Sequence, residues 1–492
     1  MEEEFSEQLI IDTDKIKNAV RLQLPLEITS YTLPRNIEIY IRKILDTFLK
    51  ECRQEHMFEY LNFCLNELLT NSKKANTKRV YFAEKKLDIN NEEDYKKGMQ
   101  SFIEDTLTNI NHYLELQKKA GLYIKSIFQI KGEQIRMEIR NNAKITSFEL
   151  ARINNKIDSV QQYKSMEDVF ANVLDQSEGA GLGIIITILM LQKIGLSKEN
   201  YQVITNDEET ITRIVLPCNQ KVFAGNEILT YEFVKMQHTI PVLKKQYEIV
   251  KNIISESPIN RNELFEVIRL DTSLAVLLLQ YKIKENPDEI DLEKVLKSYS
   301  DEELKEVFSL DNKIINLVDE SDVTRHLYKH AKDVAFYAYN ITKNFPELNP
   351  NLPIGKIYTL GLINSIGAIL LDNVSKEQVD YSNELSNEFE DTDKILDLFY
   401  SGNSNANISM IYAKKLGFSD HYATLMGNWN NARHIPEGME SVRQIIYFAE
   451  FLKFYEEKMI EFYQIDKTIL KVFGITTEEQ LNCILNKLKS EN

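Results

Sequence analysis

The feature that most constrains this chain is a glycine-rich stretch that runs without a break into an apolar segment. Gly179, Gly181 and Gly183 alternate with small or apolar residues, and the apolar run continues to Leu191. Glycine lets a backbone approach a phosphate closely, and a helix N-terminus presents free N–H groups to an anion. The stretch therefore predicts an anion-binding turn that opens a buried helix. Glycines before a buried helix can also simply make a turn, so residues elsewhere must decide.

The charge balance argues against two classes of partner. The 492 residues carry a formal net charge of −16, whereas nucleic acids and anionic membranes are bound through excess Lys and Arg. The four cysteines lie far apart without metal-ligand spacing, which is typical of reduced thiols in a cytosolic protein. The N-terminus has no signal-peptide pattern, and the longest apolar run, residues 183–191, is too short to cross a membrane. These observations predict a cytoplasmic protein that binds neither nucleic acid nor membrane.

The first half of the chain mixes helical and strand patterns. In order, these are a helix after Pro34, a helix over 55–74, a strand over 79–82, a polar helical insert over 84–122, strands over 124–130 and 134–140, the glycine stretch with its helix, and a strand over 210–216. Separated strands with helices collected on one face predict an α+β domain over residues 20–217, preceded by an acidic extension over 1–19. Within the insert, Phe102, Leu107, Ile110 and Leu114 are the expected buried positions.

The second half has a different pattern. Residues 218–234 show no clear periodicity and are predicted to be a linker. From Ile240 onward the apolar spacing is almost wholly helical, with a stripe that begins at Ile240, Leu243 and Tyr247. Residues 235–490 are therefore expected to form an all-α domain.

Two polar residues stand out on the helix over 55–74. Glu67 and Asn71 are four residues apart, so both side chains can point at one ligand from the same face of the helix. The carbonyl oxygen of Asn71 suits Mg²⁺, a hard cation that prefers oxygen ligands and keeps its own waters and nucleotide phosphates.

Residues 20–217 resemble the ATP-binding domain of the histidine-kinase-like (GHKL) ATPases. Residues 66–75 are similar to the N box of that family, E-L-x-x-N-A-x-x-x-A, and the glycine stretch is similar to its G-x-G-L-G box. The resemblance implies a two-layer α/β sandwich of the Bergerat type that binds Mg-ATP. It also implies that Glu67 is a general base, Asn71 a magnesium ligand and Lys74 a phosphate contact. The implied phosphate cradle comprises Gly179, Gly181, Leu182 and Gly183.

One box departs from the family pattern. Where the family has D-x-G-x-G, with an Asp that accepts a hydrogen bond from the adenine amino group, this chain has residues 141–145, Asn-Asn-Ala-Lys-Ile. An asparagine can accept the same bond without carrying charge, and Asn142 is the predicted adenine partner. Sensor kinases also carry a phosphoacceptor histidine on a separate helix pair. The only histidine upstream of Glu67 is His56, so the sequence offers no obvious phosphoacceptor.

Residues 235–490 are similar to the HDOD branch of the HD superfamily, a helical regulatory module. The similarity rests on Ile240 and Pro241 at the start of the module and on the segments 268–274, 330–335 and 360–370. Catalytic HD proteins hold a metal through a His-Asp pair, where this chain has Asn364 and Ser365. The resemblance therefore implies a non-catalytic module that contacts another protein, and leaves a homodimer open.

Three functions follow from these patterns. The first is an intracellular signalling protein that binds Mg-ATP next to a non-catalytic helical module and hydrolyses ATP or phosphorylates a partner. The second is an interaction scaffold that kept the ATPase fold and lost nucleotide binding. The third is a metal-dependent phosphodiesterase, which needs metal ligands that the second half does not supply.

Overall fold

The computed structural model describes residues 10–160, 182–206, 208–218, 220–348, 350–388, 405–431 and 435–490. The chain divides into two compact units, Met1–Asn219 and Gln220–Asn492. The N-terminal unit combines helices with a small antiparallel sheet, and the C-terminal unit is mainly helical. The predicted mixed α/β organisation with a helical second half is confirmed.

Five antiparallel strands form the sheet of the N-terminal unit, in the order β1-β2-β3-β5-β4. The strands are β1 (Leu26–Ser30), β2 (Ile124–Lys131), β3 (Gln134–Asn141), β4 (Tyr201–Thr205) and β5 (Thr210–Pro217). Strands β2 and β3, which correspond to the strands predicted over 124–130 and 134–140, pair as an antiparallel hairpin. Its turn contains Gly132 at φ +62°, a left-handed conformation that glycine adopts without strain.

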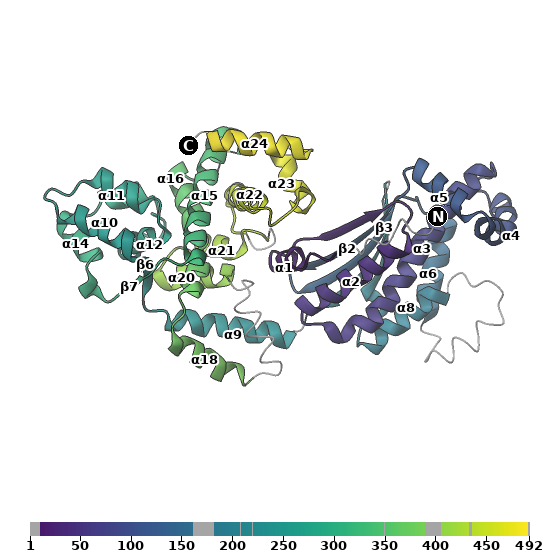
Figure 1. Cartoon of the computed structure of the whole chain (residues 1–492), viewed down its shortest axis with the longest axis horizontal. Coiled ribbons are helices and arrows are strands. Elements are labelled where there is room, and N and C mark those ends of the chain that lie inside the picture. Colours follow the sequence, from purple (N-terminus) through teal and green to yellow (C-terminus); the bar gives the residue numbers. More distant parts are fainter. Residues whose placement is uncertain are drawn as a thin grey trace. The chain divides into compact units, whose positions relative to one another are not determined.

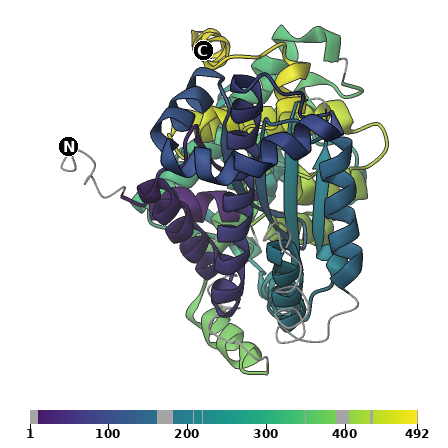
Figure 2. The same cartoon turned by 90° about the vertical axis from the view of Figure 1, so that its right-hand side faces the viewer.

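Three helices cover one face of this sheet (Figures 1 and 2). They are α2 (Arg35–Glu51), α3 (Phe58–Glu84) and α8 (Leu182–Lys193). Because strand side chains alternate between faces, Phe128, Met137 and Ile214 point the same way, and none is more than 1% exposed. Phe128 meets Phe48 of α2 with the ring centroids 6.0 Å apart. The core of the unit therefore lies between the sheet and these helices.

The predicted acidic extension contains a packed helix. Helix α1 (Thr13–Arg21) begins at an Asp12 cap and buries Ile16, Ala19 and Val20. These three residues lie at the i, i+3 and i+4 positions, which form one face of a helix.

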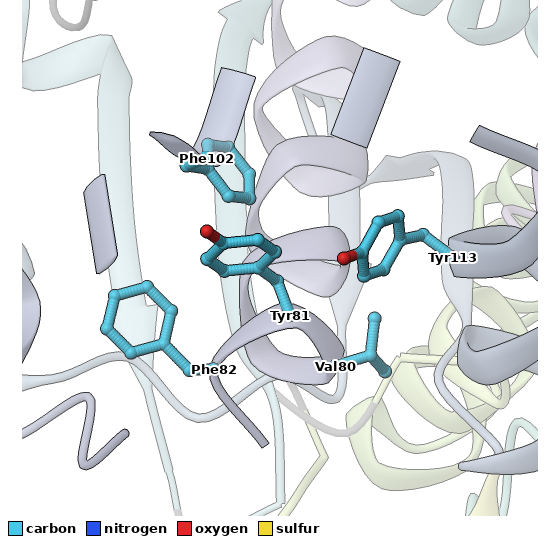
Figure 3. Close-up of a cluster of buried hydrophobic side chains, with 5 residues drawn as sticks. All are labelled: Val80, Tyr81, Phe82, Phe102 and Tyr113. Carbon is cyan, nitrogen blue, oxygen red and sulfur yellow. The ribbon is translucent and has the colours of Figure 1, made fainter. Parts of the chain in front are cut away.

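Helix α3 continues to Glu84, and the predicted strand over 79–82 is wrong. The end of α3 packs against the helices of the insert, α4 (Glu92–Thr108) and α5 (Ile110–Lys119). The buried cluster at this contact comprises Val80, Tyr81, Phe82, Phe102 and Tyr113 (Figure 3). Val, Tyr and Phe favour strands, but that preference is worth only about 1 kcal/mol and is outweighed by packing.

Burial within the insert differs in part from the expected pattern. Phe102 is buried, whereas Leu107 and Ile110 are 67% and 52% exposed. The insert breaks into two helices at Asn109, so one continuous apolar stripe does not form.

The aromatic cluster predicts a position-specific loss of stability. Phe102 packs edge-on against Tyr81 at 5.3 Å, so Phe102→Ala should lower the free energy of unfolding of this region by about 3–5 kcal/mol. The neighbouring Ile103 is 66% exposed, and Ile103→Ala should change the stability by no more than about 0.5 kcal/mol. Hydrogen exchange of the amides of residues 78–119 measures both effects. Equal protection in the two variants would contradict the packing described here.

The C-terminal unit contains the following helices: α9 (Gln220–Met236), α10 (Lys244–Ser255), α11 (Arg261–Ile268), α12 (Thr272–Lys282), α13 (Leu292–Lys297), α14 (Asp301–Val307), α15 (Asp322–Asn344), α16 (Ile354–Ile363), α17 (Ile366–Asp372), α18 (Lys376–Ser386), α20 (Asn405–Leu416), α21 (Asp420–Asn428), α22 (Glu440–Glu456), α23 (Lys467–Val472) and α24 (Glu478–Ser490).

The C-terminal unit corrects the prediction in two respects. The expected linker over 218–234 is largely helix α9, and the unit is not all-α. Strands β6 (Ile240–Leu243) and β7 (Ile315–Val318) pair in parallel, so the first residues of the predicted helical stripe belong to a strand.

One stretch of the described residues, Ile354–Asp372, is long and apolar enough to cross a membrane. It consists of the two helices α16 and α17, and 61% of its apolar window is buried inside the protein. Such burial is typical of core helices, and the stretch is consistent with a soluble protein.

Candidate functional site

A cavity of about 220 Å³ lies in the N-terminal unit between α3, the sheet and α6 (Ser147–Ser159). Helix α3 contributes Glu67, Asn71, Lys74 and Lys78 to its wall. These residues recur at spacings of three and four, so they form one stripe along the helix. The carboxylate and the amide that were predicted to act together therefore face the same cavity.

The sheet supplies the opposite wall. Its contributors are Asn141, Tyr201, Val203, Thr210 and Thr212. The strand register places Asn141 opposite Thr210 and Val203 opposite Thr212, so these side chains share the face that carries the core. Burial, together with the charge of Glu67, raises the pKa of Tyr201, which is 5% exposed. Tyr201 is therefore a neutral part of the wall.

Gly183, in the first turn of α8, lies directly against Glu67. A Cβ atom placed on Gly183 would overlap the Cγ, Cδ and Oε1 atoms of Glu67. Deeper in the same contact, the thiol of Cys64 lies 3.9 Å from the carbonyl oxygen of Thr187. The absence of a side chain at position 183 thus lets the start of α8 and the carboxylate of α3 occupy adjacent space.

A half-buried carboxylate organises the other end of the cavity. Glu149 of α6 lies 2.9 Å from Lys78 Nζ and 2.6 Å from Arg79 Nη2, and also completes the capping box of α6 with Thr146. Burial alone would raise the pKa of Glu149, but its bonds to Arg79 and Lys78 outweigh burial and lower the pKa to about 2. Glu149 is therefore ionised and fixes two cations beside the cavity.

The helical insert also reaches the cavity. Tyr95 of α4 lines it, with Lys78 Nζ 5.3 Å and the Arg152 guanidinium 5.5 Å from the centre of its ring. Both distances are within the range of cation–π attraction.

The cavity is basic in a chain that is strongly acidic overall. Five of its lining residues are cationic and two are anionic, although the whole chain has a formal charge of −16. The cations are Lys74, Lys78, Arg79, Arg152 and Lys156, and the anions are Glu67 and Glu149. This local excess favours an anionic ligand.

The structure assigns the two adjacent asparagines differently from the sequence prediction. Asn142, the predicted adenine partner, does not line the cavity, because its side chain holds the preceding loop. Its Oδ1 accepts a hydrogen bond from the Tyr123 amide at 2.8 Å, and its Nδ2 donates to the Gly121 carbonyl at 2.9 Å. Asn141 lines the cavity instead, since it continues the alternation of Ile135, Met137 and Ile139 on the helix-facing side of β3.

The remaining predicted residues divide into those that the structure describes and those that it does not. Glu67, Asn71 and Lys74 line the cavity, and Gly183 contacts Glu67. Leu182 begins α8, but its side chain is not among those described, and Gly179 and Gly181 lie outside the described residues.

Several lining residues were not selected from the sequence. Lys78 could have been found, because it continues the stripe from Asn71 and Lys74, but the wrong strand prediction over 79–82 obscured it. Glu149 and Tyr95 carry no local signal, since they reach the cavity only through the packing of α6 and α4.

In the C-terminal unit, Asn364 belongs to a buried polar cluster. Asn364 Nδ2 donates to Glu450 Oε1 at 2.7 Å, and His330 Nε2 lies 2.9 Å from Glu450 Oε2. His330 Nδ1 lies 3.5 Å from Glu457, whose carboxylate is also 3.2 Å from Lys453. Among the described residues, no group of three or more His, Cys, Asp or Glu side chains is arranged to hold a metal ion.

This cluster predicts a loss of stability at alkaline pH. Burial alone would lower the pKa of His330, but its bonds to Glu450 and Glu457 raise it to about 9, from an ordinary value of 6.5. A histidine with a raised folded-state pKa contributes stability that is complete below about pH 6.5 and is lost as the pH rises through about 9. The contribution is at most about 3 kcal/mol. Thermal unfolding should therefore separate wild type from His330→Gln at pH 6, and the difference should shrink by pH 9.5. A constant difference would contradict the ionised pair.

The comparisons with known proteins identify one relative over nearly the whole chain. An "Uncharacterized protein" of Treponema pallidum (strain Nichols) is 31% identical over 487 residues, which cover 98% of this chain and 94% of that protein. No protein-family model matches the chain. No solved structure matches it either. The similarity extends over both units, and the chain belongs to the same family as this Treponema pallidum protein.

Proposed function

We propose that the N-terminal unit binds Mg-ATP in the cavity beside α3, as a histidine-kinase-like ATPase domain with a Bergerat-type fold. The observation that carries the proposal is the contact between Gly183 and Glu67. It brings the end of the glycine stretch against the helix that carries Glu67 and Asn71, although more than 100 residues separate the two segments. The local excess of cationic side chains supports a polyphosphate as the ligand.

The donor set fits magnesium. Asn71 offers a neutral amide oxygen on the cavity wall, a ligand type suited to Mg²⁺ that keeps its waters and phosphate oxygens. When bound, the metal would neutralise phosphate charge. Lys74, one turn further along α3, can contact a phosphate oxygen. The helix start at Leu182 and Gly183 can direct backbone N–H groups at the phosphates.

Glu67 is the candidate general base. Its carboxylate lines the cavity beside Gly183 and can accept a proton from a water or hydroxyl held near the terminal phosphate. We assign the C-terminal unit to contact with a partner protein, and the whole chain to intracellular signalling in the cytoplasm.

Titration of the full-length protein with Mg-ATP, followed by a phosphate-release assay, tests this function. Wild type should bind saturably. Glu67→Gln keeps the size of the side chain and removes its basicity, so it should bind ATP while losing at least about 100-fold in turnover. Absence of saturable binding in wild type would reject the proposal. Binding with unchanged turnover in Glu67→Gln would reject the role of Glu67 alone.

The second candidate function is an interaction scaffold without nucleotide. It is favoured by residues 141–145, which lack the family's glycines, and by Glu149, which already neutralises Lys78 and Arg79. Micromolar Mg-ATP binding that requires Asn71 would exclude the scaffold.

A further inference from the structure

A relay of two buried side-chain amides fixes the orientation of Asn141 at the cavity. Asn76 Nδ2 donates to the Tyr123 carbonyl oxygen at 3.2 Å, and Asn141 Nδ2 donates to Asn76 Oδ1 at 3.3 Å. Asn76 is 0% exposed and Asn141 is 4% exposed, so water does not substitute for these partners. The order of donors and acceptors starts from the Tyr123 carbonyl, which can only accept.

The reverse orientation of either amide would bring two acceptors or two donors together. If Asn76 were turned over, its Oδ1 would face the Tyr123 carbonyl oxygen. If Asn141 alone were turned over, its Oδ1 would face Asn76 Oδ1. A buried polar group that loses its partner is costly, so each amide keeps one orientation. Asn141 Nδ2 is therefore committed to Asn76, and Oδ1 is the atom that Asn141 can offer to a ligand.

We infer that Asn76 is a specificity-determining positioning residue. By holding the neutral Asn141 amide in one orientation, Asn76 leaves Asn141 able only to accept a hydrogen bond from a ligand. The site thereby selects a 6-amino purine over a 6-oxo purine. An adenine amino group donates to Asn141 Oδ1, whereas the C6 carbonyl of guanine or hypoxanthine faces it with a second acceptor. A free asparagine amide could rotate to serve either base. The inference rests on the proposed function, because it concerns the base of the nucleotide in that cavity.

The mismatch of two acceptors in a buried site corresponds to a preference for ATP of about 10- to 100-fold. The test measures dissociation constants of Mg-ATP, Mg-GTP and Mg-ITP by calorimetry on the full-length protein. Wild type should prefer ATP over both other nucleotides. In Asn76→Ala the Asn141 amide is released, and the preference should fall to within about threefold.

The double variant Asn76→Ala/Asn141→Asp separates positioning from a general loss of structure. A carboxylate has acceptors in either orientation, so the double variant should regain a preference for ATP of at least about tenfold without Asn76. Thermal unfolding shows whether each variant is folded at the assay temperature. If Asn76→Ala alone is unfolded, a folded double variant with restored preference still supports the inference.

Four outcomes would overturn the inference. Equal binding of ATP and GTP by wild type would do so while leaving nucleotide binding intact. An unchanged preference in folded Asn76→Ala, or no restored preference in the double variant, would remove the role of Asn76. Binding of none of the three nucleotides by wild type would reject the inference together with the proposed function.

Discussion

Replacing Asn71 by alanine is expected to weaken Mg-ATP binding by about 100-fold, because it removes the proposed magnesium ligand. Losing only a residue that hydrogen-bonds to a metal ligand already lowers metal affinity by about 10- to 100-fold. Asn71 lies on the cavity wall four residues from Glu67 and is the neutral oxygen donor on that stripe of α3. The defect should depend on the metal. With EDTA present, wild type and Asn71→Ala should bind ATP equally weakly.

Asn66→Ala is the matched control for this experiment. Asn66 lies on the same helix, but its Oδ1 accepts a hydrogen bond from Arg42 of α2 at 2.9 Å and does not line the cavity. The control should leave Mg-ATP affinity within about twofold of wild type, because Asn66 makes a part-buried hydrogen bond to α2 and does not line the cavity. Equal losses in both variants would point to a damaged helix rather than to a lost magnesium ligand.

Replacing Gly183 by alanine is expected to push the flexible Glu67 side chain aside at a cost of no more than about 1 kcal/mol to the N-terminal unit, because the new methyl group overlaps the Cγ, Cδ and Oε1 atoms of Glu67. The same change should lower turnover at least about 100-fold, since Glu67 must leave the position from which it can act as the general base. Denaturant unfolding and the phosphate-release assay measure the two effects.

A double-mutant cycle with Glu67→Ala identifies the cause. All three atoms nearest to the added Cβ belong to Glu67 beyond its own Cβ, so Glu67→Ala removes them. In that background Gly183→Ala should be neutral or stabilising, because alanine is favoured over glycine in a helix by about 1 kcal/mol. An equal cost in both backgrounds would show that the contact between α8 and Glu67 is not the source of the strain.

Taken together, these two experiments distinguish the ATPase from the scaffold. A scaffold that lost nucleotide would still show the coupling of Gly183 with Glu67, since that coupling is a packing effect. It would not show a magnesium-dependent defect in Asn71→Ala. The third function, metal-dependent phosphodiesterase chemistry, requires ligands at a position where Asn364 and His330 instead bind Glu450.

The candidate site was partly predictable, because several of its elements carry local signals. The spacing of Glu67 and Asn71 fixes their common face in any helix, and apolar residues throughout the start of α8 predict its burial. The alternation of buried side chains along β3 also places Asn141, and not Asn142, on the helix-facing side of the sheet. This pattern can be read from the sequence.

Other parts of the site depend on contacts between distant segments. Glu149 approaches Lys78 and Arg79 only because α6 lies beside α3, and no spacing in the sequence encodes that pair. The amide relay likewise joins α3, the residue before β2 and the end of β3 through bonds at 3.2 and 3.3 Å.

The sequence by itself determined the mixed first half, the helical second half, the hairpin of β2 and β3, and the stripe with Glu67 and Asn71. These features depend on periodicities within single segments, which every residue of the segment reinforces. Only the tertiary structure decided that residues 79–82 continue a helix and that residues 240–243 and 315–318 pair as strands. The physical reason is one of magnitude. Intrinsic preferences differ by about 1 kcal/mol, whereas burying one large apolar side chain contributes about 1.5–3 kcal/mol, so packing decides wherever the two disagree.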